Sequence, residues 1–144
     1  MELLEVFKDF KVYILGGSQF GRYRALYELV PSPNPKPITV DSLEAYVRRL
    51  QSRYPDGGFK LDVKRIGSQT FYIVNKKSYV KTPDGRKRMV RDRVPIYFDL
   101  EAQKVYVPRW YVKNRRRLAS YILMRTLGAL GYATVKYKET LGRR

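Results

Sequence analysis

Two carboxylates and a lysine near the middle of the chain have the residue types of a metal-dependent nuclease. Pro55-Asp56 is followed by Asp62-Val63-Lys64, the order in which such enzymes place the side chains around one divalent ion. Only five residues separate the two acids. If Gly57-Gly58 forms a tight turn, Asp62 lies about three strand residues from Asp56, on the order of 10 Å, which is too far to share one ion. We therefore interpret Asp56 as a turn residue and Asp62 as an exposed strand residue.

The composition excludes most other catalytic chemistry. The 144 residues include no cysteine and no histidine. This removes disulfides, thiol nucleophiles, Cys- and His-based metal sites, and the side chain best suited to moving protons near neutral pH. The remaining acidic cluster, Asp92, Asp99 and Glu101, lies among arginines and is interpreted as structural. We expect a protein without enzymatic activity, metal or cofactor.

The charge indicates a polyanionic partner. Lys+Arg number 30 against 13 Asp+Glu, a formal net charge of +17, and residues 76–117 alone hold 14 Lys+Arg and four Asp+Glu. So many like charges repel one another in a compact fold, and a bound polyanion relieves the repulsion. Nucleic acid is the usual polyanion, and an anionic membrane is the other candidate. No apolar stretch approaches the roughly 20 residues of a membrane span, and the N-terminus has no signal-peptide pattern. We expect a cytoplasmic protein that binds nucleic acid and no membrane.

The candidate binding residues must be positioned by secondary structure. The sequence predicts that residues 1–144 form one α+β domain. We expect a small antiparallel sheet of four to five strands with helices packed on one face. Apolar residues with the helical period predict a helix over 42–54, capped by Thr39 or Asp41. A second helix is expected over 108–130.

The other segments are less regular. A short helix is expected within residues 1–10, a strand over 12–15, and a helix or a strand over 23–29. The alternating prolines of 31–37 predict an extended connector. Residues 138–144 are expected to be a frayed tail. Turn residues, above all Thr82-Pro83-Asp84-Gly85, separate a series of predicted strands. These strands are expected over 59–64, 70–74, 78–81, 86–94, 95–99, 104–107 and 133–137.

Alternating residue types assign the strand residues to two faces of the sheet, because successive side chains point to opposite sides. One face is aliphatic and should meet the helices. It is predicted to hold Val90, Val94, Ile96, Phe98, Phe71, Ile73, Val80, Val105 and Val107.

The other face should carry four tyrosines among cations. Exposed rings can stack on unpaired bases while cations hold the phosphates, a combination that grips single strands with little sequence preference. The alternative is a solvated face in which tyrosines pair with arginines across strands and only stabilise the sheet. The predicted stacking residues are Tyr72, Tyr79, Tyr97 and Tyr106, and the predicted phosphate-binding residues here are Arg86, Lys87, Arg88, Arg91 and Arg93.

A second cluster lies at the start of the predicted long helix. Trp110 could stack on a base or could anchor the helix on the sheet. The cations beside it could contact a phosphate backbone or could form a solvated face. They are Lys113, Arg115, Arg116 and Arg117.

Three segments resemble one family of known proteins. They are Val94-Pro-Ile-Tyr-Phe-Asp99, Lys104-Val-Tyr-Val-Pro108 and the stretch from Arg116 to Gly131. They are similar to the ThermoDBP family, non-OB single-stranded-DNA-binding proteins of hyperthermophilic archaea. The resemblance implies a small antiparallel sheet with helices, an aromatic cleft with basic rims, and a homo-oligomer, either a dimer or a tetramer. ThermoDBP itself has a further C-terminal zipper-like helix, and this chain has no heptads there.

The leading hypothesis is therefore sequence-nonspecific binding of single-stranded DNA without catalysis. The alternative hypothesis is an RNA-binding or ribosome-associated module, and the third hypothesis is a metal-dependent nuclease. Competition between matched DNA and RNA strands separates the first two, because only RNA carries a 2′-hydroxyl.

Overall fold

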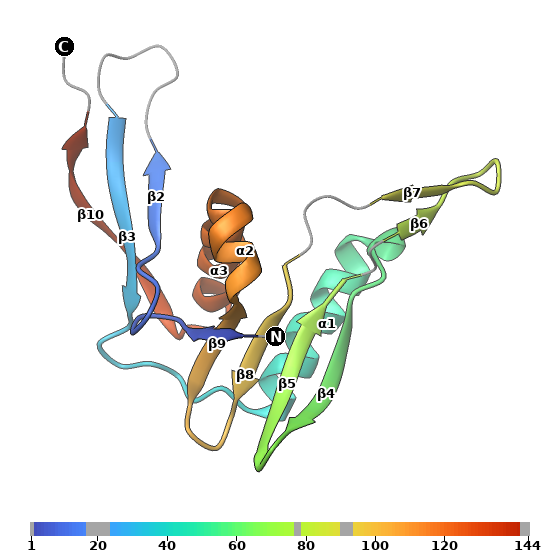
Figure 1. Cartoon of the computed structure of the whole chain (residues 1–144), viewed down its shortest axis with the longest axis horizontal. Helices are drawn as coiled ribbons and strands as arrows, with labels where there is room; N and C mark the ends of the chain where they lie inside the picture. Colours follow the sequence, from blue (N-terminus) through green and yellow to red (C-terminus); the bar gives the residue numbers. More distant parts are fainter. Residues whose placement is uncertain (1, 17–23, 77–78, 90–93, 142–144) are drawn as a thin grey trace.

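The strands form three antiparallel groups in a computed structural model, which describes residues 2–16, 24–76, 79–89 and 94–141 (Figure 1). A five-stranded sheet has the order β1-β9-β8-β5-β4, a three-stranded sheet the order β10-β3-β2, and β6 and β7 form a hairpin. The expected α+β class with an antiparallel sheet is confirmed. The bounds are β1 (Leu3–Glu5), β2 (Tyr13–Gly16), β3 (Arg24–Pro31), β4 (Lys60–Ile66), β5 (Gln69–Asn75), β6 (Tyr79–Lys81), β7 (Lys87–Met89), β8 (Ile96–Asp99), β9 (Lys104–Pro108) and β10 (Ala133–Leu141).

Two helices cover one face of the five-stranded sheet, as expected. They are α1 (Val40–Arg53) and α3 (Arg116–Ala129), and α3 lies between the two larger sheets (Figure 1). One apolar cluster joins all these elements, since Leu43 of α1, Phe98 of β8 and Leu123 of α3 are fully buried within it. The two helices are therefore held side by side over the strands β5 and β8.

The start and end of α1 follow from local sequence. Thr39 accepts a hydrogen bond from the Ser42 backbone, and the Ser42 hydroxyl accepts one from the Thr39 backbone. This capping box confirms the expected Thr39 cap and satisfies amide groups that the first turn leaves unpaired. Leu43, Tyr46 and Val47 form the buried face. The helix ends before Pro55, which begins the short 3₁₀ helix η1 (Pro55–Gly57).

The second predicted helix is interrupted. α2 (Arg109–Asn114) is followed by Arg115, whose backbone leaves the helical region at φ −138° and ψ 44°, and α3 begins at Arg116. The Asn114 side-chain amide donates to the Trp110 carbonyl at 2.9 Å. Asparagine competes with helical backbone bonding in this way, which favours a break at this position.

The N-terminal and C-terminal segments depart further from the expectations. Residues 3–5 form β1, paired with β9, so the short helix expected within residues 1–10 is wrong here. Residues 24–31 form a strand, and it pairs with both β2 and β10 in a second sheet that the sequence did not predict. β10 continues to Leu141, so the predicted fray does not begin at residue 138. Its long pairing with β3 supplies the backbone hydrogen bonds that keep these residues in the strand.

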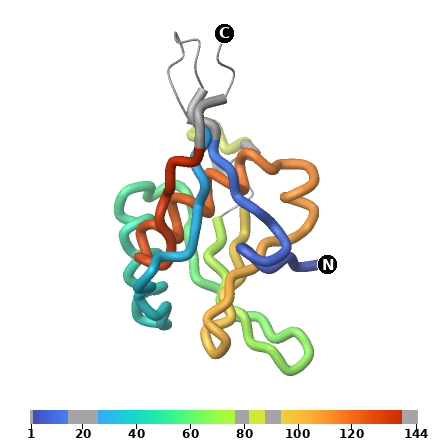
Figure 2. The backbone as a smooth tube through the Cα atoms, turned by 90° about the vertical axis from the view of Figure 1, so that its left-hand side faces the viewer, coloured from blue at the N-terminus to red at the C-terminus, as the bar shows by residue number. Residues whose placement is uncertain are grey.

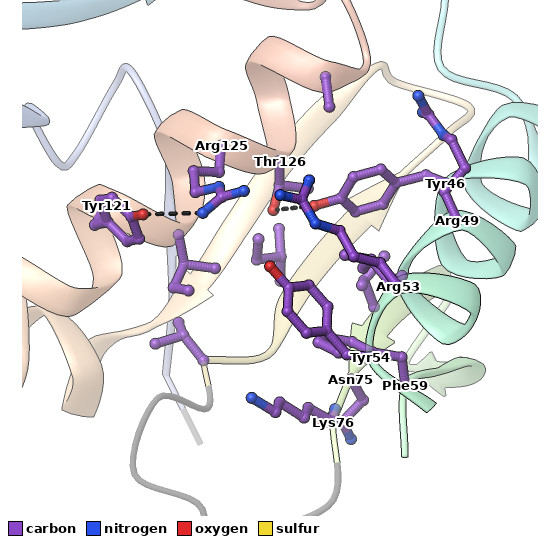
Figure 3. Close-up of a pocket in the computed structure, with 16 residues that line it drawn as sticks. Tyr46, Arg49, Arg53, Tyr54, Phe59, Asn75, Lys76, Tyr121, Arg125 and Thr126 are labelled. Carbon is purple, nitrogen blue, oxygen red and sulfur yellow. Dashed lines mark hydrogen bonds between the residues drawn. The ribbon is translucent and has the colours of Figure 1, made fainter. Parts of the chain in front are cut away.

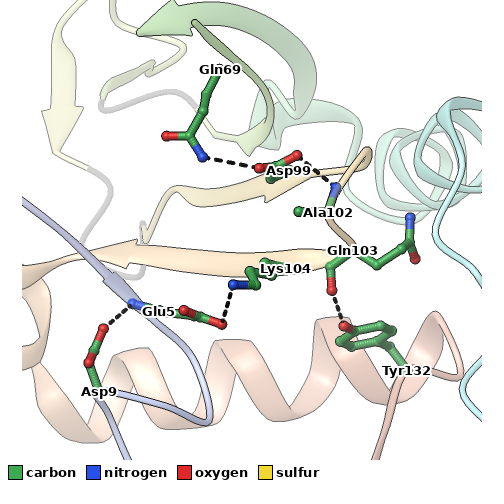
Figure 4. A network of polar contacts seen from close by, with 8 residues as sticks. All are labelled: Glu5, Asp9, Gln69, Asp99, Ala102, Gln103, Lys104 and Tyr132. Atoms are coloured by element: carbon green, nitrogen blue, oxygen red, sulfur yellow. Dashed lines mark hydrogen bonds and ion pairs between the residues drawn. The ribbon is translucent and has the colours of Figure 1, made fainter. Parts of the chain in front are cut away.

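Polar contacts fix the turn between β8 and β9 (Figure 4). Asp99 accepts hydrogen bonds from the Ala102 backbone and from the Gln69 side chain, each at 3.1 Å, which agrees with its structural interpretation. Gln103, at φ 54°, bonds through its side chain to both backbone groups of Ile38, at 2.9 Å each. The Tyr132 hydroxyl donates to the Gln103 carbonyl. This turn therefore ties the sheet to the connector before α1 and to the segment after α3.

Candidate nucleic-acid interface

A cleft of about 380 Å³ opens between α1 and α3, above strands β5 and β8 (Figure 3). Half of its lining residues are aromatic or cationic. Among the residues that the structure describes, the lining holds no Asp or Glu. The aromatic residues are Tyr46, Tyr54, Phe59 and Tyr121, and the cations are Arg49, Arg53, Lys76 and Arg125.

The α1 wall of the cleft carries two of the tyrosines. Tyr46 is buried, and its hydroxyl lies 3.2 Å from the Thr126 hydroxyl of α3, a hydrogen bond that links the two helices at the base of the cleft. Tyr54, just after the helix, is 41% exposed. Its side chain and that of Arg53 point from α1 toward α3 (Figure 3). This wall therefore has a fixed base and an accessible upper ring.

The α3 wall presents Tyr121 and Arg125, one helical turn apart. Arg125 Nη1 donates to the Tyr121 phenol oxygen at 2.9 Å, and Tyr121 is 45% exposed. This hydrogen bond, together with the electrostatic influence of the same phenol and those of Tyr54 and Tyr46, raises the pKa of Arg125 above its ordinary value. Arg125 therefore faces the tyrosines of both walls and keeps its charge at every physiological pH.

The end of the cleft near β4 and β5 is lined by Phe59 and Lys76. The Lys76 ammonium lies 5.3 Å from the Phe59 ring centroid, and the rings of Phe59 and Tyr54 lie 6.1 Å apart. Val74 and Ile96, directly paired in β5 and β8, provide an apolar floor. The cleft thus combines an apolar base with a charged end.

Every aromatic ring of the lining has one of the lining cations beside it. The guanidinium carbons of Arg49, Arg53 and Arg125 each lie 5.7 Å from the centroid of a tyrosine ring, that of Tyr46, Tyr54 and Tyr121 respectively. Such pairs keep a cation near the face of each ring. A planar base that stacks on an accessible ring would bring its phosphate close to a positive charge. The chemistry available here is stacking and anion binding.

The tyrosines predicted from strand alternation do not form this site. The register places Tyr72 opposite Phe98, on the face that meets the helices, so its expected outward position is wrong. The same register places Phe71 and Ile73 on the far face with Tyr97, where all three are buried. Strand β5 is apolar at four successive positions, 71–74, and alternation therefore could not distinguish its two faces.

Tyr97 and Tyr106 share the predicted face, away from the helices, yet pack against a neighbour. Both rings contact Phe71 edge to face, with centroids 5.9 Å and 5.6 Å away. Tyr97 is only 5% exposed, so the expected stacking role for it is wrong. Tyr106 is half-buried in the same cluster. The alternative of a solvated face with tyrosine–arginine pairs is also wrong for these two residues, because their rings pack on Phe71 in an aromatic cluster that stabilises the sheet.

The predicted phosphate-binding residues of strands 78–94 lie around the β6–β7 hairpin. Arg86 and Lys87 are exposed on it. Tyr79 and Arg88 belong to its paired strands, but their side chains are outside the described part of the chain. Arg91 and Arg93 lie outside the described residues altogether.

The predicted Trp110 cluster is exposed but separate from α1. Trp110 is 57% exposed and contacts Tyr111 edge to face at 4.9 Å, so it does not anchor the helix on the sheet. α2 and α1 lie on opposite sides of the molecule in Figure 2. Arg116 donates a hydrogen bond to the Lys11 carbonyl at 3.0 Å, so its guanidinium group already has a partner within the fold. The other predicted cations here are exposed: Lys113, Arg115 and Arg117.

The tyrosines of the cleft were not among the binding residues that the sequence predicted. The available signal was an aromatic residue followed by an arginine three or four positions later, as in Tyr46/Arg49 and Tyr121/Arg125. Residues so spaced share one helix face. Two such pairs on separate helices form one site only if the helices face one another. The sequence does not show this arrangement, and the structure does.

The carboxylates considered for a nuclease remain apart from any metal-ligand cluster. Asp56 lies in η1, whereas Asp62 lies in β4 beside Lys60, 3.8 Å away. In the described ranges, no three or more Asp and Glu residues gather as a metal site would require. Asp56 is exposed in the short helix, as expected for a turn residue, whereas Asp62 lies in a strand but is half-buried and also accepts from the Asn75 amide at 3.5 Å, so its expected exposure is wrong.

No protein-family model, curated protein or solved structure matches this chain. Within residues 2–16, 24–76, 79–89 and 94–141, none of the helices is long and apolar enough to cross a bilayer.

Proposed function

We propose that this protein binds single-stranded nucleic acid, in the first place DNA, in the cleft between α1 and α3, without sequence preference and without catalysis. The observation that carries the proposal is the composition of the cleft. Four aromatic residues each lie beside a cation, and the described lining contains no carboxylate to repel a phosphate.

The accessible rings favour single strands over duplexes. Tyr54 and Tyr121 stand on opposite walls, and each is nearly half exposed. Stacking on such rings requires a base whose faces are free, and the bases of a duplex already stack on one another. A nucleic-acid strand with unpaired bases can place these bases in the cleft. The arginines of the lining, Arg49, Arg53 and Arg125, then neutralise its phosphates.

The aromatic residues of the lining support binding without sequence preference. Stacking is tolerant of sequence because every base has a π face. Two hydroxyls between the helices, those of Tyr46 and Thr126, bond to one another at 3.2 Å. The resemblance to single-stranded-DNA-binding proteins noted above leads to the same proposal, with an aromatic cleft and basic rims.

The test is a competition experiment on the unmodified protein. Fluorescence anisotropy of a labelled strand of about 20 nucleotides is followed while unlabelled single strand, duplex and RNA compete, across a series of salt concentrations. The proposal predicts that single strands compete far better than duplex. Equal competition by duplex would refute it, and stronger competition by matched RNA would reassign the cleft to RNA.

A further inference from the structure

The β6–β7 hairpin extends away from both larger sheets (Figure 1). Within the described chain its two strands pair only with one another. An isolated two-stranded hairpin is at best marginally stable in water, because it has no sheet or helix to cover a face. A projection of this kind therefore suggests a surface that acts by contacting a partner.

The hairpin begins and ends at the cleft. Lys76, on one side of it in the sequence, and Val94, on the other side, both line the cleft. Its tip is closed by a well-formed turn: the Thr82 backbone donates to the Arg86 carbonyl at 2.8 Å, and Gly85 takes φ 83°. From Tyr79 to the tip at Asp84 an extended chain spans up to about 16 Å, at roughly 3.3 Å per residue. The hairpin can therefore continue a path that starts in the cleft.

The charge of this segment matches a phosphate backbone. Residues 76–93 include eight Lys+Arg and two Asp+Glu. Arg86 and Lys87, next to the turn, are both exposed to solvent. Asp84, one of the two acids, is used in the turn: a hydrogen bond from the Thr82 hydroxyl and one from the Arg86 backbone lower its pKa.

We infer that the β6–β7 hairpin is an arm that binds the phosphates of the strand held in the cleft, so that the full site requires a strand long enough to reach from the cleft to the hairpin. This inference rests on the proposed function of the cleft. The cleft supplies stacking, whereas the arm supplies contacts that depend on strand length and salt but not on sequence.

The experiment compares oligothymidylates of increasing length, from about 4 to about 20 nucleotides, a range that covers known single-strand site sizes. The test variant is Arg86→Gln/Lys87→Gln, which removes two exposed charges from the hairpin. The control is Lys64→Gln/Arg65→Gln, which removes two exposed charges from β4 at the opposite end of the sheet. Thermal unfolding of each variant confirms that it is folded.

If the hairpin is such an arm, the loss of affinity in the hairpin variant should depend on the length of the oligothymidylate. For long strands the hairpin variant should lose affinity, and the slope of log affinity against log salt should fall by about 1.4, at about 0.7 per phosphate contact. The shortest strands should bind it as they bind the unmodified protein, and the control should keep the original slope. If the hairpin variant and the control behave alike at every length, the arm is refuted.

A third variant separates the two proposals. Tyr54→Ala/Tyr121→Ala should weaken binding at all lengths, including the shortest. If it binds every strand as the unmodified protein does, the cleft proposal fails. If it weakens binding while the hairpin variant keeps the original affinity and slope, the cleft proposal stands and the arm alone is overturned.

Discussion

Arg125 donates a hydrogen bond to the phenol oxygen of Tyr121 at 2.9 Å, and its guanidinium carbon lies 5.7 Å from the centroid of the same ring. The pair holds an aromatic surface and a positive charge at one fixed point on α3. Because the phenol oxygen accepts this bond, the phenol proton is available to donate to a ligand. Tyr54 and Arg53 make a matching pair on the α1 wall, so the cleft presents two such points that face one another.

The exposed rings should contribute to binding and little to folding. We expect Tyr54→Ala or Tyr121→Ala to weaken single-strand binding by about 1–3 kcal/mol each, the usual cost of removing one stacked ring. Fluorescence anisotropy measures the loss. Tyr137→Ala is the control, because Tyr137 is comparably exposed on β10, away from the cleft. A variant that is folded and binds as before would remove its tyrosine from the site.

Adjacent arginines on α1 should differ in their effect. Arg49 lines the cleft, whereas Arg48 pairs with Glu44 at 3.8 Å on the solvent side of the same helix. Arg49→Ala should reduce the salt dependence of binding by about 0.7 in log–log slope, the value for one phosphate contact on a single strand. Arg48→Ala should leave the slope unchanged. Equal slopes for the two variants would show that only the overall charge matters.

Tyr97 should be a folding residue and not a binding residue. Its ring is buried against Phe71 on the face opposite the helices. Tyr97→Ala should lower the free energy of unfolding by about 3 kcal/mol or more, as large-to-small changes in packed aromatic clusters do. Urea unfolding measures this loss. The folded fraction should bind single strands normally, and a large loss of affinity without a loss of stability would contradict the assignment.

Tyr132 should make stability fall at alkaline pH. Its hydroxyl donates to the Gln103 carbonyl, and burial, followed by the charge of Glu5, raises its pKa above the ordinary value of 10.0. The fold therefore favours the neutral phenol. This contribution to stability is complete below pH 10.0 and is lost as the pH rises through the raised pKa of the folded state.

Unfolding free energies measured on either side of pH 10.0 test this point. Tyr132→Phe should cost about 1 kcal/mol below that pH, through the lost hydrogen bond, and should show a smaller alkaline decrease than the unmodified protein. Tyr54→Phe, at an exposed hydroxyl, provides the control. An unchanged alkaline decrease in Tyr132→Phe would show that other groups cause it.

Local patterns in the sequence predicted the elements well where one face of an element is apolar. The period of Leu43, Tyr46 and Val47 and the cap at Thr39 define α1, and the turn at 82–85 defines the hairpin. The break at Arg115 depends on a side chain of Asn114 that bonds to the backbone, and propensity alone does not show it. The pairing of β1 with β9 joins segments about a hundred residues apart, which no local pattern encodes.

The sequence predicted the chemistry of the candidate site but not the residues that form it. Charge and aromatic content indicated stacking and phosphate binding, but the residues chosen were those of the strands. Tyr72 turned inward because its neighbours in β5 are apolar on both faces. Tyr46 and Tyr121 occur on different helices, and only the packing of α1 beside α3 brings them to one cleft.

The most direct test of the central claim is photo-cross-linking of the unmodified protein to a single strand that contains 5-iododeoxyuridine, with the cross-linked residues identified by mass spectrometry. An iodinated base reacts efficiently with an aromatic side chain on which it stacks. The account predicts cross-links to Tyr54 and Tyr121, on the two walls of the cleft. Cross-links concentrated at Trp110 and Tyr111, with none in the cleft, would contradict it and would place the strand on α2.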